Sequence, residues 1–344
     1  MAFNPKLEFY KFQLKSSDGN TKTFRDFAIE ELKGAKSISN DDAFKKCFEH
    51  FIKTIGKEHA KSPTKKMTIT IIDNPRTNPY IKLKPSPTIN KHIIAGVING
   101  GPYDKDAIVS SIANKEKNRK LGRDNSILLP YFVFIYLPSD YHEGLFAIHS
   151  NSVEESVTAI FRSYISNLFR GDNYNKAILQ PFCPQSFQDE FRKGAIIKTI
   201  NFSTTIVENT HSTDPIQQLL QEYTIRIEAT PKDRRENAIP LSEAKKVFNF
   251  FEKKIFKSSK NKEVTLDNFT EKSVVAENDV TKNTKVFQLN QEDDNFVPVV
   301  KLQNRIRIID GSPDFEELRK YCLEIFENEI LTEIRPDLNA KKIN

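Results

Sequence analysis

Residues 127–169 read ILLPYFVFIYLPSDYHEGLFAIHSNSVEESVTAIFRSYISNLF and form the most strongly patterned stretch of the chain. The apolar run at 127–137 has the length of a strand and shows no polar alternation, which predicts a strand buried on both faces. Residues 138–140 predict a turn. Residues 144–149 follow as a second strand, antiparallel to the first. A buried hairpin therefore lies at the centre of the predicted fold.

An amphipathic helix is predicted directly after this hairpin. Ser152 and Glu155 have the spacing of a capping box, in which each residue satisfies a free backbone N–H at the start of a helix. Apolar side chains then recur at helical spacing as far as Phe169, and Gly171 ends the run. A hairpin followed by such a helix forms a hydrophobic core and carries no catalytic signature.

The rest of the chain alternates short strands with amphipathic helices. Strands are predicted at residues 7–15, 22–27, 67–72, 80–83, 93–98, 195–207 and 222–229, with three or four more between 264 and 309. Helices are predicted from Asn40 to Gly56, from Ser186 to Gly194, after Ser242, and after Gly311 with Ser312 as the cap and Pro313 in the first turn. Most of these strands show alternating apolar and polar residues, and they come in hairpin-like groups. The predicted class is therefore α+β, with two domains of mostly antiparallel sheet and flanking amphipathic helices.

The segment TPKDRRENAIP at residues 230–240 is charged and bounded by prolines, as domain linkers often are. It predicts an N-terminal α+β domain at residues 1–230 and a C-terminal α+β domain at residues 231–344. A chain of 344 residues is long enough for two such domains.

Composition narrows the class of protein. The formal net charge of +6 is mildly basic, short of the excess typical of a dedicated nucleic-acid binder. No apolar run reaches the length of a membrane span, and the first residues lack the apolar region of a signal peptide, so we expect a cytoplasmic protein without membrane insertion. Cys47, Cys183 and Cys322 are far apart and have no metal-ligand spacing. We therefore predict no metal and no cofactor.

The sequence lacks the familiar catalytic motifs. Gly100 and Gly101 stand without the Lys-Ser/Thr pair that a phosphate-binding loop needs. The Glu-x-Lys spacing at Glu243 falls on a predicted helix, where the two side chains diverge. We predict no catalytic residue, but an enzyme stays open as an alternative. That alternative is a nuclease or other hydrolase with an unrecognised site, whose candidate residues are Asp140, His142 and His149.

Clusters of basic residues carry the leading hypothesis. The three main clusters are Lys115, Lys117, Arg119, Lys120 and Arg123; Lys232, Arg234 and Arg235; and Lys253, Lys254, Lys257, Lys260 and Lys262, with a weaker one at Lys57, Lys61, Lys65 and Lys66. Flexible cations spaced along loops suit a phosphate backbone. The predicted nucleic-acid-binding residues are Lys115, Lys117, Arg119, Lys120, Arg123, Arg234, Arg235, Lys257 and Lys260.

The predicted ligand is duplex DNA, with RNA as the alternative. The sequence shows no helix-turn-helix, zinc finger or aromatic RNA-stacking motif, so we expect phosphate contacts of low sequence specificity. A third reading is a protein-binding sensor or scaffold subunit, in which exposed aromatic residues of the last helix, such as Tyr321, would make the contacts.

The order of elements resembles the RexA family of phage exclusion proteins. The resemblance is carried by FYKFQLK near the N-terminus, by LPYFVFIYLP and GLFAIHS, by AILQPFCPQSFQDEFRKGAIIKTINF, and by VTLDNFTEK, VPVVKLQNRI and PDFEELRKYC near the C-terminus. It implies a cytoplasmic anti-phage protein that binds DNA as a dimer without catalysing a reaction. The resemblance does not separate this family from other bacterial defence proteins, such as the DNA-binding component of the Kiwa system, and it leaves open a partner protein of a defence system.

Overall fold

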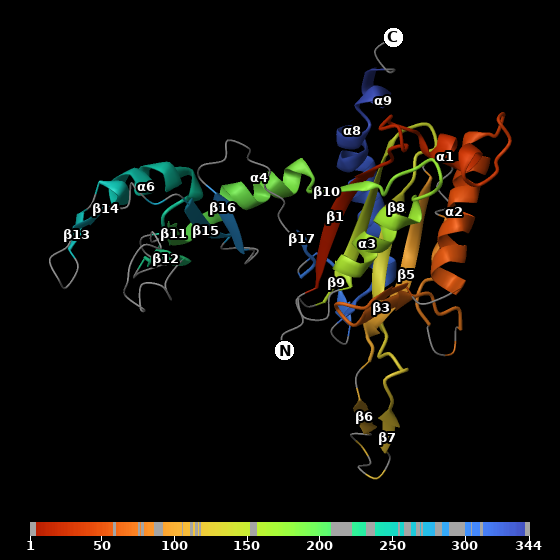
Figure 1. Cartoon of the computed structure of the whole chain (residues 1–344), viewed down its shortest axis with the longest axis horizontal. Helices are drawn as coiled ribbons and strands as arrows, with labels where there is room; N and C mark the ends of the chain where they lie inside the picture. Colours follow the sequence, from red (N-terminus) through yellow and green to blue (C-terminus); the bar gives the residue numbers. More distant parts are fainter. Residues whose placement is uncertain are drawn as a thin grey trace, which may run out of the picture. The chain divides into compact units, whose positions relative to one another are not determined.

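The computed structural model describes residues 5–57, 60–74, 76, 79–85, 92–104, 106–110, 113, 116, 118–151, 157–207, 222–231, 238–253, 255–257, 263–265, 269, 271–278, 284–288, 300–303, 305–309 and 312–340. It confirms the α+β class with antiparallel sheets (Figure 1). The chain divides into unit 1, Met1–Pro184 with Val299–Asn344, and unit 2, Gln185–Pro298.

These units differ from the sequence-based division at residue 230. That position falls inside unit 2, because β11 (Ala195–Val207) pairs with β12 (Glu222–Ala229) on one side and with β15 (Glu271–Asn278) on the other. Unit 1 is discontinuous for a similar reason. Its strand β17 (Val300–Lys301) pairs with β1 (Lys6–Gln13), so residues from the two ends of the sequence share one sheet.

The main sheet of unit 1 has the order β10-β1-β9-β8-β5-β3-β2, with β17 beside β1 and β4 beside β5. Its strands besides β1 and β17 are β2 (Ala60–Ser62), β3 (Met67–Thr70), β4 (Lys84–Pro85), β5 (Ile93–Pro102), β8 (Leu129–Tyr136), β9 (Glu143–Ser150) and β10 (Ile178–Phe182). The predicted hairpin is β8 and β9, which are antiparallel as expected. Every pairing in this sheet is antiparallel.

Helices cover both faces of this sheet, which explains why β8 is apolar throughout. The first face packs on α1 (Phe24–Glu30), α2 (Asn40–Lys57) and α3 (Thr158–Leu168), and Val133 and Ile135 of β8 belong to that core. The second face receives α7 (Phe315–Ile325) and its continuation η2 (Phe326–Ile330). There Phe326 packs on Phe134 and Tyr136. The chain then forms α8 (Leu331–Ile334) and α9 (Pro336–Ala340).

Three local predictions in unit 1 are wrong. Residues 22–27 do not form a strand: α1 begins at Phe24, after Thr23, which makes a reciprocal capping box with Asp26. Ser312 does not cap α7: it lies with Pro313 in β19 (Ser312–Pro313), opposite β18 (Ile308–Ile309), and Asp314 is the cap. Residues 80–83 are not a strand, and β4 follows them. The predicted capping pair Ser152 and Glu155 lies outside the described residues.

Unit 2 contains an antiparallel sheet of order β12-β11-β15-β16, with β16 at Thr284–Gln288. Helices α4 (Gln185–Gly194) and α6 (Ala244–Glu252) supply Phe191 and Phe248 to its core, where Phe202 is fully buried. The short helix η1 (Leu241–Glu243) precedes α6, and β13 (Ile255–Lys257) pairs with β14 (Glu263–Thr265). As predicted, α4 ends at Gly194 and β12 runs from Glu222 to Ala229.

None of the helices in the part of the chain that the structure describes combines the length and the apolar character that a membrane crossing requires.

Candidate nucleic-acid interface

A two-stranded ribbon leaves the main sheet of unit 1 between β5 and β8. Its strands are β6 (Ala107–Ser110) and β7 (Asn118–Leu121), and we call residues 103–126 the arm. In Figure 1 the arm extends beyond the end of the sheet, below β3. The sequence patterns predicted no strand between residues 98 and 127. The structure instead forms an antiparallel ribbon whose strands pair with each other.

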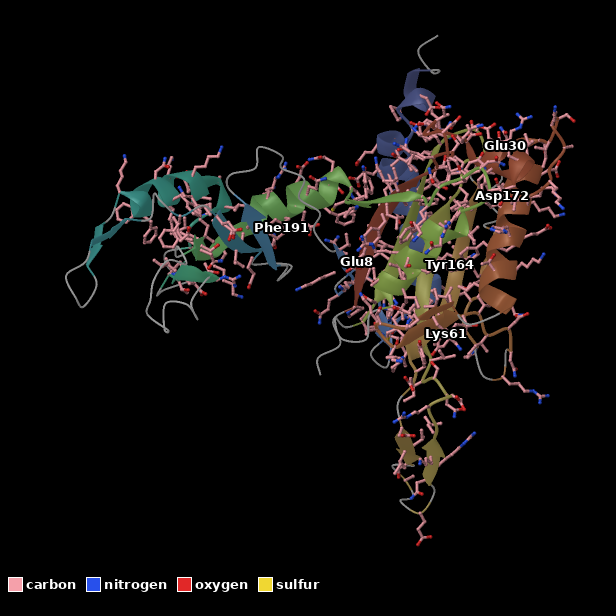
Figure 2. All side chains as sticks on the ribbon, viewed as in Figure 1. Glu8, Glu30, Lys61, Tyr164, Asp172 and Phe191 are labelled. Atoms are coloured by element: carbon pink, nitrogen blue, oxygen red, sulfur yellow. The ribbon has the colours of Figure 1, made fainter. Side chains whose placement is uncertain are left out.

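The register of the ribbon places an apolar side chain opposite a cationic one on each face. Val109 lies opposite Arg119, and Ile108 lies opposite Lys120. Directly opposed residues in an antiparallel pair point to the same face, and consecutive residues point to opposite faces. Arg119 and Lys120 therefore project from opposite sides of the ribbon. Figure 2 shows the side chains of the arm leaving the ribbon on both sides.

The side chains of the ribbon are open to solvent. Ile108 is 72% exposed and Val109 is 51% exposed, and Arg119 and Lys120 are also exposed. Among the residues that the structure describes, Arg119 and Lys120 take part in no ion pair. Arg123 differs, because its Nε lies 3.4 Å from the Asp106 carboxylate. Two cations of the ribbon are thus available to an external anion.

The weaker basic cluster lies where the arm joins the sheet. Lys61 of β2 and Lys66 of the β2–β3 turn place their ammonium groups 5.9 Å and 6.0 Å from the centre of the Tyr103 ring (Figure 2 labels Lys61). Such distances allow a cation–π attraction. Lys65 is exposed beside them. We call Lys61, Lys65, Lys66, Tyr103 and Arg123 the arm base.

Ion pairing and backbone strain fix the geometry of the arm base. The Lys66 ammonium lies 2.7 Å from the Asp104 carboxylate, and its hydrogen bond lowers the pKa of Asp104 and raises the pKa of Lys66. Both residues have positive φ, 51° for Lys66 and 59° for Asp104. Left-handed backbone is uncommon outside glycine, and such strain gathers at functional sites. The Tyr103 N–H also donates to the Lys66 carbonyl at 3.0 Å.

The structure brings together two of the four basic clusters. Arg123 lies near Lys66 of the weaker cluster where the arm joins the sheet, and Arg119 and Lys120 lie farther out on the ribbon. The remaining predicted residues of this cluster, Lys115 and Lys117, lie outside the described residues.

The two other main clusters belong to unit 2. Lys257 lies on β13, but its side chain is outside the described residues, and so are Arg234, Arg235 and Lys260 altogether.

Three residues of the arm were missed by the sequence reading: Tyr103, Ile108 and Val109. The apolar pair at 108–109 inside a polar, basic stretch was the available signal. It could not show which face each residue occupies, because that depends on the strand register.

The residues proposed for an unrecognised hydrolase do not meet. His142 and His149 stand at opposite ends of β9, about 23 Å apart at the usual rise of a strand. His149 is fully buried, and this burial lowers its pKa to about 4. Asp140 instead accepts hydrogen bonds from Arg335 at 3.1 and 3.2 Å. Across the described ranges, no group of three or more His, Cys, Asp or Glu side chains is placed to hold a metal ion.

A cavity of about 350 Å³ lies beside this Arg335–Asp140 pair. His92 lines it, but both of its ring nitrogens have partners: Asp41 at 3.0 Å and the Ser139 N–H at 3.3 Å. The Arg335 guanidinium is held by Asp337 as well as Asp140. The Arg335 contacts hold the C-terminal helices to the β8–β9 turn, so we interpret the residues around the cavity as structural.

Tyr321, named for the scaffold alternative, is not an exposed residue. It lies half-buried on α7, with its hydroxyl oxygen inaccessible to solvent.

The arm is therefore the surface that best fits a polyanion in the described part of unit 1. A comparison with known proteins finds no matching family model, no matching curated protein and no matching solved structure.

Proposed function

We propose that the protein binds duplex DNA through phosphate contacts, with low sequence specificity and without catalysing a reaction. The observation that carries this proposal is the pair of exposed cations, Arg119 and Lys120, on opposite faces of a projecting ribbon. Such cations bind phosphates by releasing condensed counterions, and the gain does not depend on base sequence.

The arm base enlarges this cationic surface. Lys61 and Lys65 are exposed, and Tyr103 offers a partly open aromatic ring between lysines. Lys66 and Arg123 contribute less, because Asp104 and Asp106 partly neutralise them. About four phosphate contacts would give a salt dependence that lowers affinity roughly a hundredfold between 50 and 200 mM salt.

The biological setting of this activity is part of the proposal. The order of elements that resembles the RexA family supports a role in anti-phage defence. On this proposal the protein works in the cytoplasm as a homo-oligomer, with or without another protein of the same defence system. Expressing the chain in a phage-sensitive host should lower plaque counts, and the arm variant described next should restore them.

Fluorescence anisotropy with a labelled duplex tests the binding directly. The double variant Arg119→Glu/Lys120→Glu should weaken binding about a hundredfold at low salt and reduce the slope of log K against log salt by about 2. The matched control, Lys36→Glu/Lys45→Glu, makes the same charge change at exposed positions outside the arm. Because long-range repulsion acts on both variants, only the difference between them measures the arm.

Two outcomes contradict the proposal. One is the absence of binding to duplex DNA at low salt, and the other is an equal loss in the two charge-reversal variants. Incubating the protein with plasmid and with RNA, with and without magnesium or manganese, separates it from the nuclease alternative. We expect both substrates to stay intact.

A further inference from the structure

The arm has two properties that a surface loop does not need. Its cations face in opposite directions, and each shares its face with an exposed β-branched side chain. We infer that the arm enters the major groove of duplex DNA with one edge leading, so that each face of the ribbon meets one wall of the groove. This inference rests on the proposed function and specifies how the DNA is held.

The dimensions of the ribbon favour this groove. One sheet layer with its side chains is about 10 Å thick, as the spacing of stacked sheets shows. The major groove of B-form DNA is about 12 Å wide and admits a two-stranded ribbon, whereas the minor groove is about 6 Å wide. The thickness of a ribbon therefore suits the major groove and exceeds the width of the minor groove.

The charges match the two walls. Phosphates line both sides of the groove, so an inserted ribbon needs a cation on each face. Arg119 beside Val109 would meet one strand, and Lys120 beside Ile108 would meet the other.

The exposed apolar pair indicates that the ribbon is covered in its working state. An isolated two-stranded ribbon is only marginally stable in water, and Ile108 and Val109 are not buried by the rest of the described chain. The groove offers them the methyl groups of thymine. A second copy of the arm would bring Arg119 and Lys120 against like charges, whereas DNA brings opposite ones.

Binding to modified duplexes tests the choice of groove. Duplexes containing glucosylated 5-hydroxymethylcytosine carry bulky sugars in the major groove, and the minor-groove ligand netropsin blocks the other side. We expect glucosylation to weaken binding at least about tenfold and saturating netropsin to change it less than about twofold. The opposite pattern would overturn the inference while leaving DNA binding intact. No binding to the unmodified duplex would instead refute the proposed function itself.

Variants of the apolar pair test its role in the same assay. The wild-type protein should prefer a thymine-containing duplex to its uracil counterpart by a few-fold, because uracil lacks the methyl group. Ile108→Ser/Val109→Ser should abolish this preference and keep most of the salt dependence. Ile309→Ser is the matched control, since Ile309 is 48% exposed outside the arm. A preference that survives in Ile108→Ser/Val109→Ser excludes these side chains from the groove.

Discussion

The β8–β9 hairpin and the β6–β7 ribbon are both antiparallel, and only residues 122–128 separate them in the chain. In β8 every residue from Tyr131 to Tyr136 is buried. In the ribbon every described residue from Ile108 to Ser110 and from Asn118 to Lys120 is exposed. The same backbone pairing thus serves as the centre of a core in one place and as a projection into solvent in the other.

The difference shows that strand pairing alone does not decide what a hairpin does. Helices α3 and α7 lie on opposite faces of the β8–β9 hairpin and exclude water from it. No helix covers the ribbon in the described chain. Its side chains are therefore not constrained by core packing and can suit a ligand instead. Stability should therefore depend on the first hairpin, and binding should depend on the second.

The largest expected contrast comes from removing one apolar side chain from each region. Phe146→Ala should lower the free energy of unfolding by about 3–5 kcal/mol, because the buried Phe146 ring packs on Tyr10, Phe12 and Phe161. Ile108→Ala should change it by less than about 0.5 kcal/mol. Hydrogen exchange of the β8 and β9 amides during urea titration measures both. Equal effects would show that the ribbon is part of the core.

The next largest effect is expected in the pH dependence of stability, which should come from the β8–β9 hairpin and not from the ribbon. Burial lowers the pKa of His149 to about 4 in the folded protein, below its unfolded value of about 6.5. The unfolded chain therefore gains a proton first, and stability should fall by up to about 3 kcal/mol as pH drops from about 6.5 to about 4. Residues 107–121 contain no histidine, so the ribbon adds no imidazole to this titration.

His149→Gln isolates this effect in urea titrations at successive pH values. Its stability relative to wild type should rise as pH falls, because glutamine takes up no proton. A difference that stays constant with pH would assign the acid sensitivity to other groups.

The junction between the two regions should tolerate less change than the ribbon itself. A Cβ added at Gly101 would overlap the carbonyl oxygen of Ile127, which leads from the arm into β8. Gly101→Ala should therefore destabilise unit 1 by about 1–3 kcal/mol. Gly122→Ala is the control, since its Cβ would meet only the Asn125 amide nitrogen at 3.8 Å. Thermal unfolding compares the two variants, and similar melting temperatures would contradict the prediction.

The smallest effect on stability is expected when the ribbon is removed altogether. Replacing Ala107–Leu121 with an Asn-Gly turn should keep the unfolding free energy within about 0.5 kcal/mol of wild type, since none of the described side chains in this segment is buried. DNA binding should weaken at least as much as in the charge-reversal variant. A large loss of stability would mean that the arm supports the sheet.

The buried regions were the ones that the sequence could predict. Long apolar runs predicted β8 and β9, and clean alternation predicted β12, because burial imposes these patterns. The capping pair Thr23 and Asp26 was present in the sequence, but residues 22–27 were predicted as a strand. No local sequence pattern predicted that unit 1 is discontinuous, because the pairing of β1 with β17 joins strands that are far apart in the sequence.

The candidate site was predictable in its residue types and not in its geometry. The basic character of residues 115–123 is evident in the sequence. The sequence does not reveal that Arg119 and Lys120 project from opposite faces. A ribbon exposed on both faces has no apolar–polar alternation from which its register could be predicted. The meeting of Lys61 and Lys66 with Tyr103 depends on the pairing of β3 with β5.

The insertion of unit 2 into unit 1 has a consequence for synthesis. At about 5–20 residues per second, a ribosome needs on the order of ten seconds to travel from Gln185 to Phe326. During that interval the strands from β1 to β10 have been synthesised, but Phe326, whose ring packs on Phe134 and Tyr136, has not. The nascent chain therefore exposes an apolar face of the incomplete sheet. We expect a chaperone that covers this face until the chain leaves the ribosome to increase the yield of folded protein.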